Sequence, residues 1–179
     1  ISATGYLSLL ALLLKTGFLL PEGQFSSDSG SLQPLARRLL SSLDRKSAVP
    51  RLMLPGNVWL SLSDVEEILK VKAAFSVALD SLLSAAGEGV RSRVTLCIAG
   101  ALGEHADPGD LETLVFIPSG MAGAVRAVGN TSLEGAGLLG LHQDLRERLS
   151  RMCADISLLR PDQEQNFHRR YIDAMHFGG

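Results

Sequence analysis

One short stretch has residue types and spacing suited to ligand binding. Residues 94–103 read Val-Thr-Leu-Cys-Ile-Ala-Gly-Ala-Leu-Gly, an apolar run that ends in small residues. This pattern predicts a buried strand that runs into a tight turn before a helix. Ligands of open α/β sheets bind at the carboxyl ends of strands, where glycine lets a flat ligand approach the backbone closely. By itself the stretch fits a ligand-binding turn or an ordinary turn packed with small side chains.

A second turn of the same kind follows a second predicted strand. Residues 124–128 favour a strand, and Gly129 and Asn130 come directly after it. The next four residues, Thr-Ser-Leu-Glu at positions 131–134, fit a capping box that starts a helix. The amide of Asn130 is suited to bind a ligand, and it is equally suited to the turn before that helix.

Several helices and a hairpin must position these turns. We expect a helix to about Thr16 that is closed by Gly17, and a hairpin of strands at 51–54 and 57–60. A capping box at residues 63–66 predicts a long helix to about Ala86. Its inner side should carry Val65, Ile68, Leu69, Phe75, Leu79, Leu82 and Leu83.

The rest of the chain alternates between helical and extended patterns. Further helices are predicted at 32–43, from Asp107-Pro108 onward, at 142–153 and from Pro161 to about Met175, and a last strand at 155–159. Strands that alternate with helices from Val94 onward predict an α/β fold with some parallel pairing.

Composition excludes several functions. The formal net charge is −2 without a basic block, so nothing favours binding to DNA or RNA. The apolar run at residues 6–14 is shorter than the roughly 20 residues that span a membrane. Cys97 and Cys153 are expected to be buried free thiols, as in a reducing cytoplasm. The histidines lack the spacing of a zinc site: His105, His142, His168 and His176.

Taken in order, several blocks resemble one family. They are Ile-Ser-Ala-Thr-Gly-Tyr-Leu at 1–7, Leu-Ser at 62–63 with Lys-Ala-Ala at 72–74, Ile-Ala-Gly-Ala-Leu-Gly at 98–103, Val-Gly-Asn-Thr-Ser-Leu-Glu-Gly-Ala at 128–136, and the tail from Asn166 to Phe177. In this order they resemble the C-terminal domain of the reductive activators of corrinoid-dependent proteins. Those activators are ATPases of the acetate kinase, sugar kinase, Hsp70 and actin superfamily.

The resemblance implies a fold and a site. The fold would be α/β, a ribonuclease-H-like lobe of an actin-like ATPase with a mixed sheet and flanking helices. Residues 1–179 would form the C-terminal lobe of a larger protein, with a small inserted or mobile segment at 26–50. Lys72, Gly129 and Asn130 would flank the nucleotide, although a solvated lysine on a helix face is the simpler expectation for Lys72. The implied adenosine motif comprises Ala99, Gly100, Ala101, Leu102 and Gly103.

The resemblance also implies an activity. The activator uses ATP and Mg²⁺ to help deliver an electron from a [2Fe-2S] domain, outside this chain, to a cobalt(II) corrinoid protein and so restores cobalt(I). Such a protein would be cytoplasmic and could pair as a homodimer, and this part alone should be inactive because the phosphate-binding hairpins would lie upstream of Ile1.

Two departures keep another function open. The family usually has glycine where Ala101 stands and an aromatic residue where Leu102 stands. They favour the alternative of a degenerate lobe that does not bind nucleotide and acts in dimerisation or corrinoid-protein docking. A sugar-kinase-like or acetate-kinase-like phosphotransferase is a weaker alternative, because no catalytic base lies in a matching motif.

Overall fold

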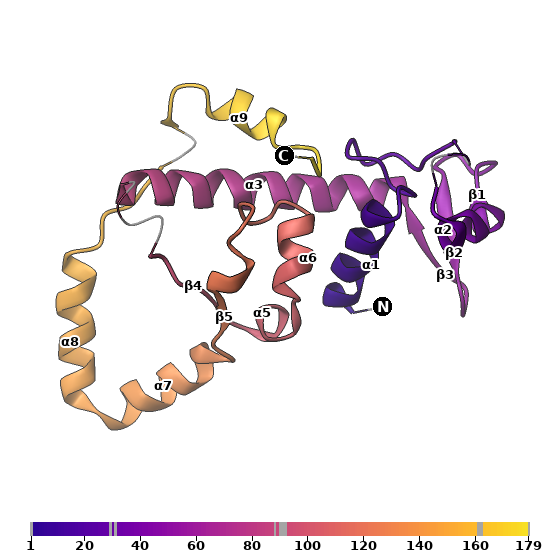
Figure 1. The fold of residues 1–179 in the computed structure, drawn as a ribbon. Helices are drawn as coiled ribbons and strands as arrows, with labels where there is room; N and C mark the ends of the chain where they lie inside the picture. Colours follow the sequence, from indigo (N-terminus) through magenta and orange to yellow (C-terminus); the bar gives the residue numbers. More distant parts are fainter. Residues whose placement is uncertain are drawn as a thin grey trace.

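The computed structural model describes residues 2–28, 30, 32–87, 89, 93–160 and 163–178, and of Ala101 and Leu102 it describes the backbone alone. A mixed α/β chain results, in which the helix α3 (Leu62–Ala86) is the longest described element and runs through the middle of the molecule (Figure 1). The N-terminal helix and hairpin lie at one end of α3. The strands β4 and β5 lie on one side of it, and α9 lies on the other.

Helix α1 (Ala3–Lys15) anchors the core. The Ser2 hydroxyl caps it by accepting from the Gly5 amide at 3.1 Å. Gly17 ends it with φ 76°, as predicted. The helix is strongly apolar, and it buries one face together with the residues that follow it. The fully or almost fully buried side chains here are Leu10, Ala11, Leu13, Phe18 and Leu19.

A small antiparallel sheet packs next to α1. Strand β1 (Leu43–Asp44) pairs with β2 (Arg51–Leu54), which pairs with β3 (Val58–Ser61) in the predicted hairpin. Gly56 and Asn57 turn the hairpin with positive φ values of 76° and 58°, a conformation that glycine and asparagine tolerate best. The helix predicted at 32–43 is shorter, because α2 (Pro34–Leu39) passes into a 3₁₀ turn (Leu40–Ser42) and then into β1.

The cap of α3 differs from the prediction. Ser61, rather than Ser63, caps the helix, with Asp64 as the reciprocal partner: the Ser61 amide donates to Asp64 at 2.8 Å, and the Asp64 amide donates to Ser61 Oγ at 3.2 Å. A cap residue needs an extended backbone. Ser61 has one (φ −94°, ψ 161°) because it also ends β3, whereas Ser63 already lies inside the helix.

The buried face of α3 is only partly the predicted one. Val65, Leu69, Leu79 and Leu83 are buried, and Ile68 is partly buried against the core, in agreement with the pattern. Phe75 and Leu82 were wrongly expected inside, since their side chains are 42% and 57% exposed. Different elements cover different stretches of this long helix, so no single stripe is buried along its whole length. The buried set also includes Lys72, Ala73, Val77 and Ser81.

The C-terminal half contains the second sheet. Its parallel strands are β4 (Leu96–Ile98) and β5 (Val125–Ala127), and a 3₁₀ turn (Ala122–Ala124) leads into β5. The helices are α5 (Ala101–His105), α6 (Pro108–Thr113), α7 (Thr131–Leu141), α8 (Gln143–Ala154) and α9 (Phe167–Asp173). Asp107 caps α6 as predicted, by accepting from the Asp110 amide at 3.0 Å.

Two predictions for this half are wrong. Residues 155–159 form no strand, because they find no partner strand in the described part of the chain, and Ile156 and Leu158 are 70% and 72% exposed. The last helix begins at Phe167 rather than after Pro161, which lies outside the described residues.

The cysteines are exposed, which contradicts the expectation of buried thiols. Side chains alternate between the two faces of a strand. In β4 the partly buried positions are Leu96 and Ile98, so Cys97 between them points outward. Cys153 lies on α8, a helix with no buried residue.

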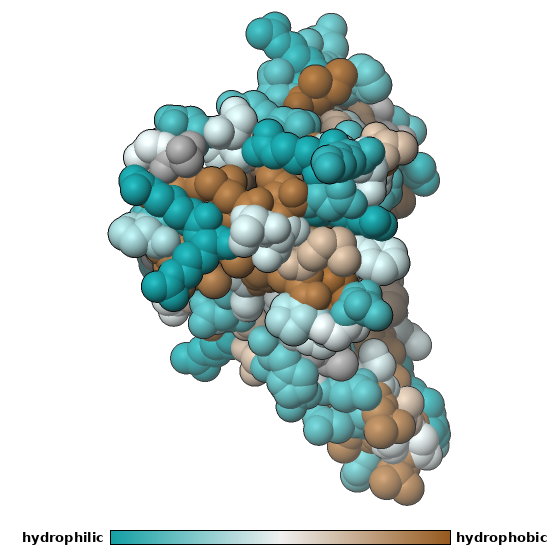
Figure 2. Space-filling model, turned by 90° about the vertical axis from the view of Figure 1, so that its right-hand side faces the viewer, coloured by the Kyte–Doolittle hydropathy of each residue, from teal (hydrophilic) through white to brown (hydrophobic). Residues whose placement is uncertain are grey.

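Apolar side chains also lie on the surface. On the face shown in Figure 2, hydrophobic side chains are interspersed among hydrophilic ones. Large exposed apolar residues include Leu35, Leu133 and Leu141, with exposed fractions of 67%, 73% and 84%. None of the described helices is both long and apolar enough to cross a membrane.

Candidate nucleotide site

The two predicted glycine turns lie at the same edge of one sheet. Strands β4 and β5 pair in parallel, with Ile98 opposite Ala127 at their ends. The pairing continues one step further, because the Val128 amide donates to the Ile98 carbonyl at 3.0 Å. Both strands therefore end together, and the turn that follows each of them starts from this edge, where ligands of α/β sheets bind.

A backbone hydrogen bond joins the two turns. The Gly100 amide donates to the Gly129 carbonyl at 2.8 Å. Both residues have positive φ, 88° at Gly100 and 70° at Gly129, which disfavours any residue with a β-carbon. A β-carbon built at either position would meet no atom of the described residues within 4 Å, so the described part of the chain leaves open space beside each turn. Backbone conformation explains both glycines, and the open space leaves room for a ligand.

A helix starts at each turn. Helix α5 follows Gly100 directly, and the Glu104 amide donates to the Gly100 carbonyl at 3.0 Å. Helix α7 follows Asn130, whose side-chain oxygen accepts from the Leu133 amide at 3.4 Å. The capping box predicted at 131–134 is therefore wrong by one position, because Asn130 is the last non-helical residue and takes the cap. The amide end of α7 carries the positive end of a helix dipole.

Gly103 lies inside the structure, between α5 and β4. A β-carbon at this position would lie 3.0 Å from the Ile98 β-carbon and 3.1 Å from the Ile98 carbonyl carbon, and closer still to an Ile98 methyl group. Real β-carbons essentially never come so close, so only glycine allows α5 to pack on β4 at this separation. Gly103 thus fixes the position of the turn at Gly100.

The other members of the predicted adenosine motif stay predictions. Ala99 is exposed between the end of β4 and the turn. The backbones of Ala101 and Leu102 lie in α5, and their side chains are outside the described part of the structure.

Glu112 holds the loop that leads into β5, a role that the sequence did not suggest. One carboxylate oxygen accepts from the Gly120 amide at 3.0 Å and the other from the Ala122 amide at 2.8 Å. These two bonds keep the pKa of Glu112 below its ordinary value. The sequence feature that could have indicated this role is an acidic residue on a helix that is followed by the Pro-Ser-Gly turn at 118–120.

Replacing Glu112 by glutamine should loosen this loop, because an amide can offer only one acceptor oxygen to the two donors. A carboxyl group whose pKa is depressed by folding stabilises the protein above its unfolded-state pKa, and this stabilisation is lost as the pH falls through the folded-state value. The Tm of the wild type should therefore exceed that of E112Q at neutral pH, and the gap should narrow in acid. If thermal melts showed a difference in Tm between the wild type and E112Q that is independent of pH, the role of the ionised Glu112 in holding the loop would be contradicted.

Lys72 does not belong to the glycine turns. Its ammonium group donates to the carbonyls of Ala174 at 2.9 Å and His176 at 2.8 Å, and the residue is only 2% exposed. Burial lowers the pKa of Lys72. Its partners lie in the C-terminal segment, on the other side of α3 from β4 and β5 (Figure 1). The expectation of a solvated lysine is wrong, because this segment folds over the helix, which local sequence does not reveal.

Side chains that could ligate a metal ion or an iron–sulfur cluster are the next feature of the described residues. No group of three or more His, Cys, Asp or Glu side chains that could hold a metal ion occurs among the described residues. The whole chain has two cysteines, fewer than the four thiolates that a [2Fe-2S] cluster takes in ferredoxins.

Comparison with known proteins defines the class of this fold. A family model places the mixed α/β fold in the actin-like class that includes acetate kinase, sugar kinases and Hsp70. A family model described as the "C-terminal domain of RACo the ASKHA domain" matches residues 1–179, and the chain belongs to this family.

A solved structure has the same fold. It is described as "Reductive activator for corrinoid,iron-sulfur protein", with a TM-score of 0.80 and 18% sequence identity. The match covers 98% of this chain and 28% of the solved chain, so the present chain spans less than a third of that protein. No curated protein matches the chain.

Proposed function

We propose that this chain is the nucleotide-binding lobe of an ATP-dependent reductive activator, a protein that restores cobalt(I) in a corrinoid protein. The electron would come from a [2Fe-2S] domain outside this chain, and the protein would work in the cytoplasm. Membership in the activator family supports this function. The solved protein with the same fold, which is described as an activator for a corrinoid, iron-sulfur protein, agrees with it.

One observation carries the proposal. The turns at Gly100 and Gly129 come from separate sequence motifs, yet they adjoin through the 2.8 Å bond between the Gly100 amide and the Gly129 carbonyl. The space beside both glycines is open. The adenine base of a nucleotide is flat and carries both donors and acceptors, so it suits an edge formed of exposed backbone.

Each part of the site has a distinct task in this proposal. The turn at 99–103 would contact adenosine, and Gly129 with Asn130 would line the opposite side. The amide end of α7 would favour the negative charge of the phosphates. ATP would bring Mg²⁺ mainly through its own phosphate oxygens, since Mg²⁺ is usually bound by a few carboxylates together with substrate phosphates.

Calorimetric titration with ATP and ADP tests this function directly. We expect nucleotide binding to the wild type, and roughly 5- to 30-fold weaker binding in Gly100→Ala and Gly129→Ala, since forcing a β-carbon into the left-handed region costs roughly 1–2 kcal/mol and shifts the turn. Gly120→Ala is the matched control. Gly120 also has a positive φ, 82°, with open space around it, but it lies in the loop before β5.

The absence of heat and of thermal stabilisation at millimolar nucleotide would contradict nucleotide binding. Equal weakening in Gly120→Ala would show that the loss comes from general backbone strain. A gain of binding in Ala101→Gly would identify the alanine as the residue that limits affinity.

The rival function is a degenerate lobe that serves as a docking or dimerisation surface. It is favoured by α7 and α8, which have no buried residue and expose large apolar side chains such as Leu133, Leu141 and Met152. Sedimentation of the wild type with and without nucleotide separates the two functions. Association that is independent of nucleotide, together with no binding heat, would favour the rival.

A further inference from the structure

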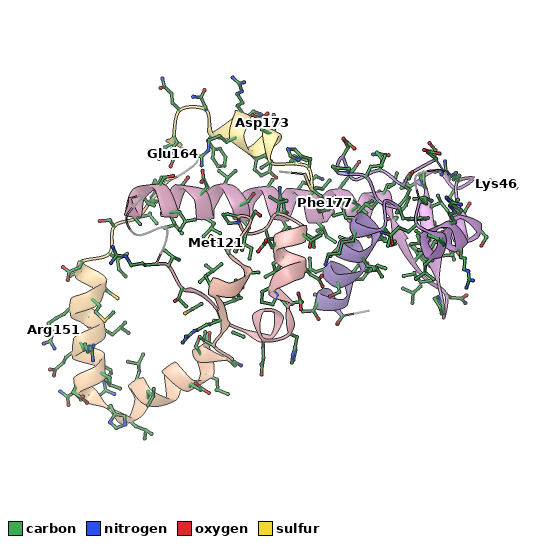
Figure 3. All side chains as sticks on the ribbon, viewed as in Figure 1. Lys46, Met121, Arg151, Glu164, Asp173 and Phe177 are labelled. Carbon is green, nitrogen blue, oxygen red and sulfur yellow. The ribbon has the colours of Figure 1, made fainter. Side chains whose placement is uncertain are left out.

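The C-terminal segment at residues 163–178 lies along α3 and is joined to it mainly by polar contacts. We call this segment the strap. Figure 3 shows Glu164 and Asp173 in the strap over α3, with Phe177 where the strap meets the helix. Helix α9, its middle part, has no buried residue. Among residues 163–178 only Phe177 is buried, at 4% exposure. Apolar burial therefore stabilises the Phe177 end of the strap more than it stabilises α9.

Phe177 anchors one end of the strap. Its side chain belongs to the main hydrophobic core, and its amide donates to the Pro21 carbonyl at 2.7 Å. Pro21 comes shortly after Phe18 and Leu19, two side chains that are almost completely buried where α1 ends. This end of the strap is therefore joined to the most deeply buried part of the molecule, both by an apolar side chain and by a backbone hydrogen bond.

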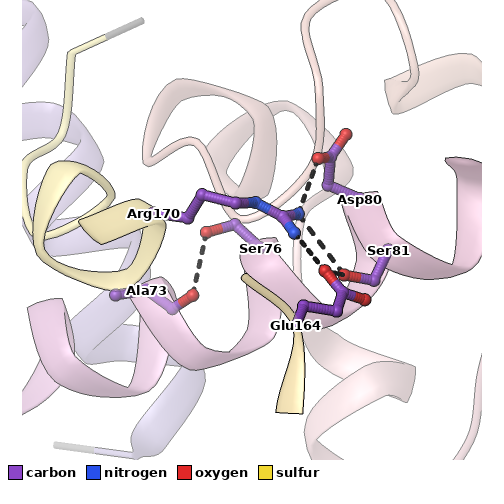
Figure 4. A network of polar contacts seen from close by, with 6 residues as sticks. All are labelled: Ala73, Ser76, Asp80, Ser81, Glu164 and Arg170. Carbon is purple, nitrogen blue, oxygen red and sulfur yellow. Dashed lines mark hydrogen bonds and ion pairs between the residues drawn. The ribbon is translucent and has the colours of Figure 1, made fainter. Parts of the chain in front are cut away.

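An arginine joins the α9 end of the strap to α3. Arg170 donates to Asp80 at 2.9 Å and to Ser81 at 3.3 Å, both on α3, and to Glu164 of the strap at 2.6 Å (Figure 4). The side chains of Arg170, Asp80 and Glu164 are 32%, 48% and 39% exposed, so water and salt reach both ion pairs. Ion pairs with this much exposure stabilise a protein only slightly, and salt weakens them.

Lys72 joins α3 to the residues between α9 and Phe177. Its ammonium group donates to the carbonyls of Ala174 and His176, at 2.9 and 2.8 Å. Both acceptors belong to the strap, so these bonds exist only while the strap lies on α3. A cavity of about 330 Å³ lies beside them, between α3 and the strap, so the packing of the two elements is incomplete.

The two ends of the strap differ in what it costs to detach them. A segment of a fold opens separately from the rest where few buried apolar contacts hold it. Detaching α9 breaks polar contacts, and water replaces these hydrogen bonds at a small net cost. Detaching the other end would expose the buried ring of Phe177 to water, which costs more. Opening of the strap should therefore begin at α9 and stop before Phe177.

We propose that the strap is a conformational switch in which α9 detaches from α3 while Phe177 stays in the core. The ion pairs of Arg170 set the balance between the closed and the open form, so that salt favours the open form. Opening uncovers the side of α3 that carries Lys72, Val77 and Ser81, which are 2%, 4% and 6% exposed in the closed form. The switch is separate from the glycine turns, and the proposal holds whether or not those turns bind nucleotide.

Native-state hydrogen exchange of the wild-type chain, followed by NMR and corrected for intrinsic exchange rates, tests the proposal. Three hydrogen-bonded amides report on it: Ala174 at the end of α9, Phe177 at the anchor and Leu19 in the core. We expect the Ala174 amide to be the least protected of the three, and to lose protection between about 0.1 M and about 1 M salt, where screening becomes strong. The Phe177 and Leu19 amides should keep similar, higher protection at both salt concentrations.

Three results would overturn the proposal. Equal protection of all three amides would show that the strap detaches only when the whole fold unfolds. Exchange of the Phe177 amide together with that of Ala174 would show that the anchor does not hold. Protection of Ala174 that is independent of salt would show that the ion pairs do not control the opening.

A pair of neighbouring arginines supplies a variant and its matched control. Arg170→Gln should raise the opening equilibrium at Ala174 by roughly two- to thirtyfold at low salt and remove most of the salt dependence, since two half-exposed ion pairs are lost. Arg169→Gln is the control, because Arg169 is 81% exposed and pairs at 3.7 Å with Asp173 of the same helix. Equal effects of the two substitutions would overturn the role of Arg170.

Lys72→Met tests the second polar contact. It should raise the opening equilibrium at Ala174 by at least about tenfold, because two hydrogen bonds from a charged donor are lost, while the Leu19 amide keeps its protection. Unchanged protection of Ala174 in Lys72→Met would overturn the role of this lysine in closing the strap. If Lys72→Met does not fold, the wild type and the two arginine variants still decide whether the strap opens separately.

Discussion

Replacing Gly103 by alanine should lower the free energy of unfolding by about 1–3 kcal/mol, the usual effect of overpacking a tight site. The added methyl group would lie within 3.0 Å of the Ile98 β-carbon and 3.1 Å of its carbonyl carbon, so strand β4 itself must move. Because Gly100 lies between Ile98 and Gly103, its bond to Gly129 should weaken and nucleotide binding should fall with stability. Chemical denaturation and calorimetry measure the two effects.

Gly137→Ala is the matched control for this prediction. Gly137 lies inside α7, and a β-carbon there would meet nothing within 4 Å. Alanine should stabilise that helix by up to about 1 kcal/mol, which is the opposite sign. Shortening Ile98 to alanine in the Gly103→Ala background should recover part of the nucleotide affinity. If Gly103→Ala and Gly137→Ala lowered the free energy of unfolding equally, the packing role of Gly103 would be contradicted.

Replacing Phe18 by alanine should lower the free energy of unfolding by about 3–5 kcal/mol, as is typical when a buried aromatic ring is removed. Phe18 is fully buried, and its ring centroid lies 5.7 Å from that of Phe25 in a tilted contact. Since Phe18 directly follows the glycine that ends α1, its loss leaves a cavity where this helix meets the rest of the core. Urea unfolding followed by circular dichroism measures the change.

Phe75→Ala supplies the comparison for Phe18. Phe75 forms a similar tilted contact with Phe116, with centroids 6.0 Å apart, but it is 42% exposed. Its removal should cost clearly less than that of Phe18, because both the buried area that is lost and the cavity that is left are smaller. If Phe75→Ala were as destabilising as Phe18→Ala, the assignment of the core to the α1 end of the molecule would be wrong.

Local signals in the sequence predicted the structure correctly where the backbone groups of an element bond to residues close by in the chain. The glycine that closes α1, the hairpin at 51–60 and the Asp107 cap all depend on neighbours within a few residues. The predicted capping boxes lie one or two positions away from the observed caps, for a related reason. Several hydroxyl, amide and carboxyl residues compete near each helix start, and the end of β3 or the turn at Gly129 decides which of them is the last non-helical residue.

Burial could not be predicted as well as secondary structure. Phe75 and Leu82 fit the apolar pattern of α3, yet no described element covers them fully. Residues 155–159 have the composition of a strand, but a strand needs a partner to satisfy its backbone groups, and the described chain provides none. Periodicity identifies the apolar face of an element and leaves open what packs against it.

By itself the sequence determined the family, the hairpin, most of the helices and the two glycine turns, because these depend on residue type and spacing. Only the tertiary structure decided that the turns adjoin at Gly100 and Gly129, that Gly103 packs on Ile98, and that Lys72 is buried under the C-terminal segment. Each of these is a contact between residues far apart in the chain or on different elements. Their formation depends on how helices and strands pack, and no local pattern encodes it.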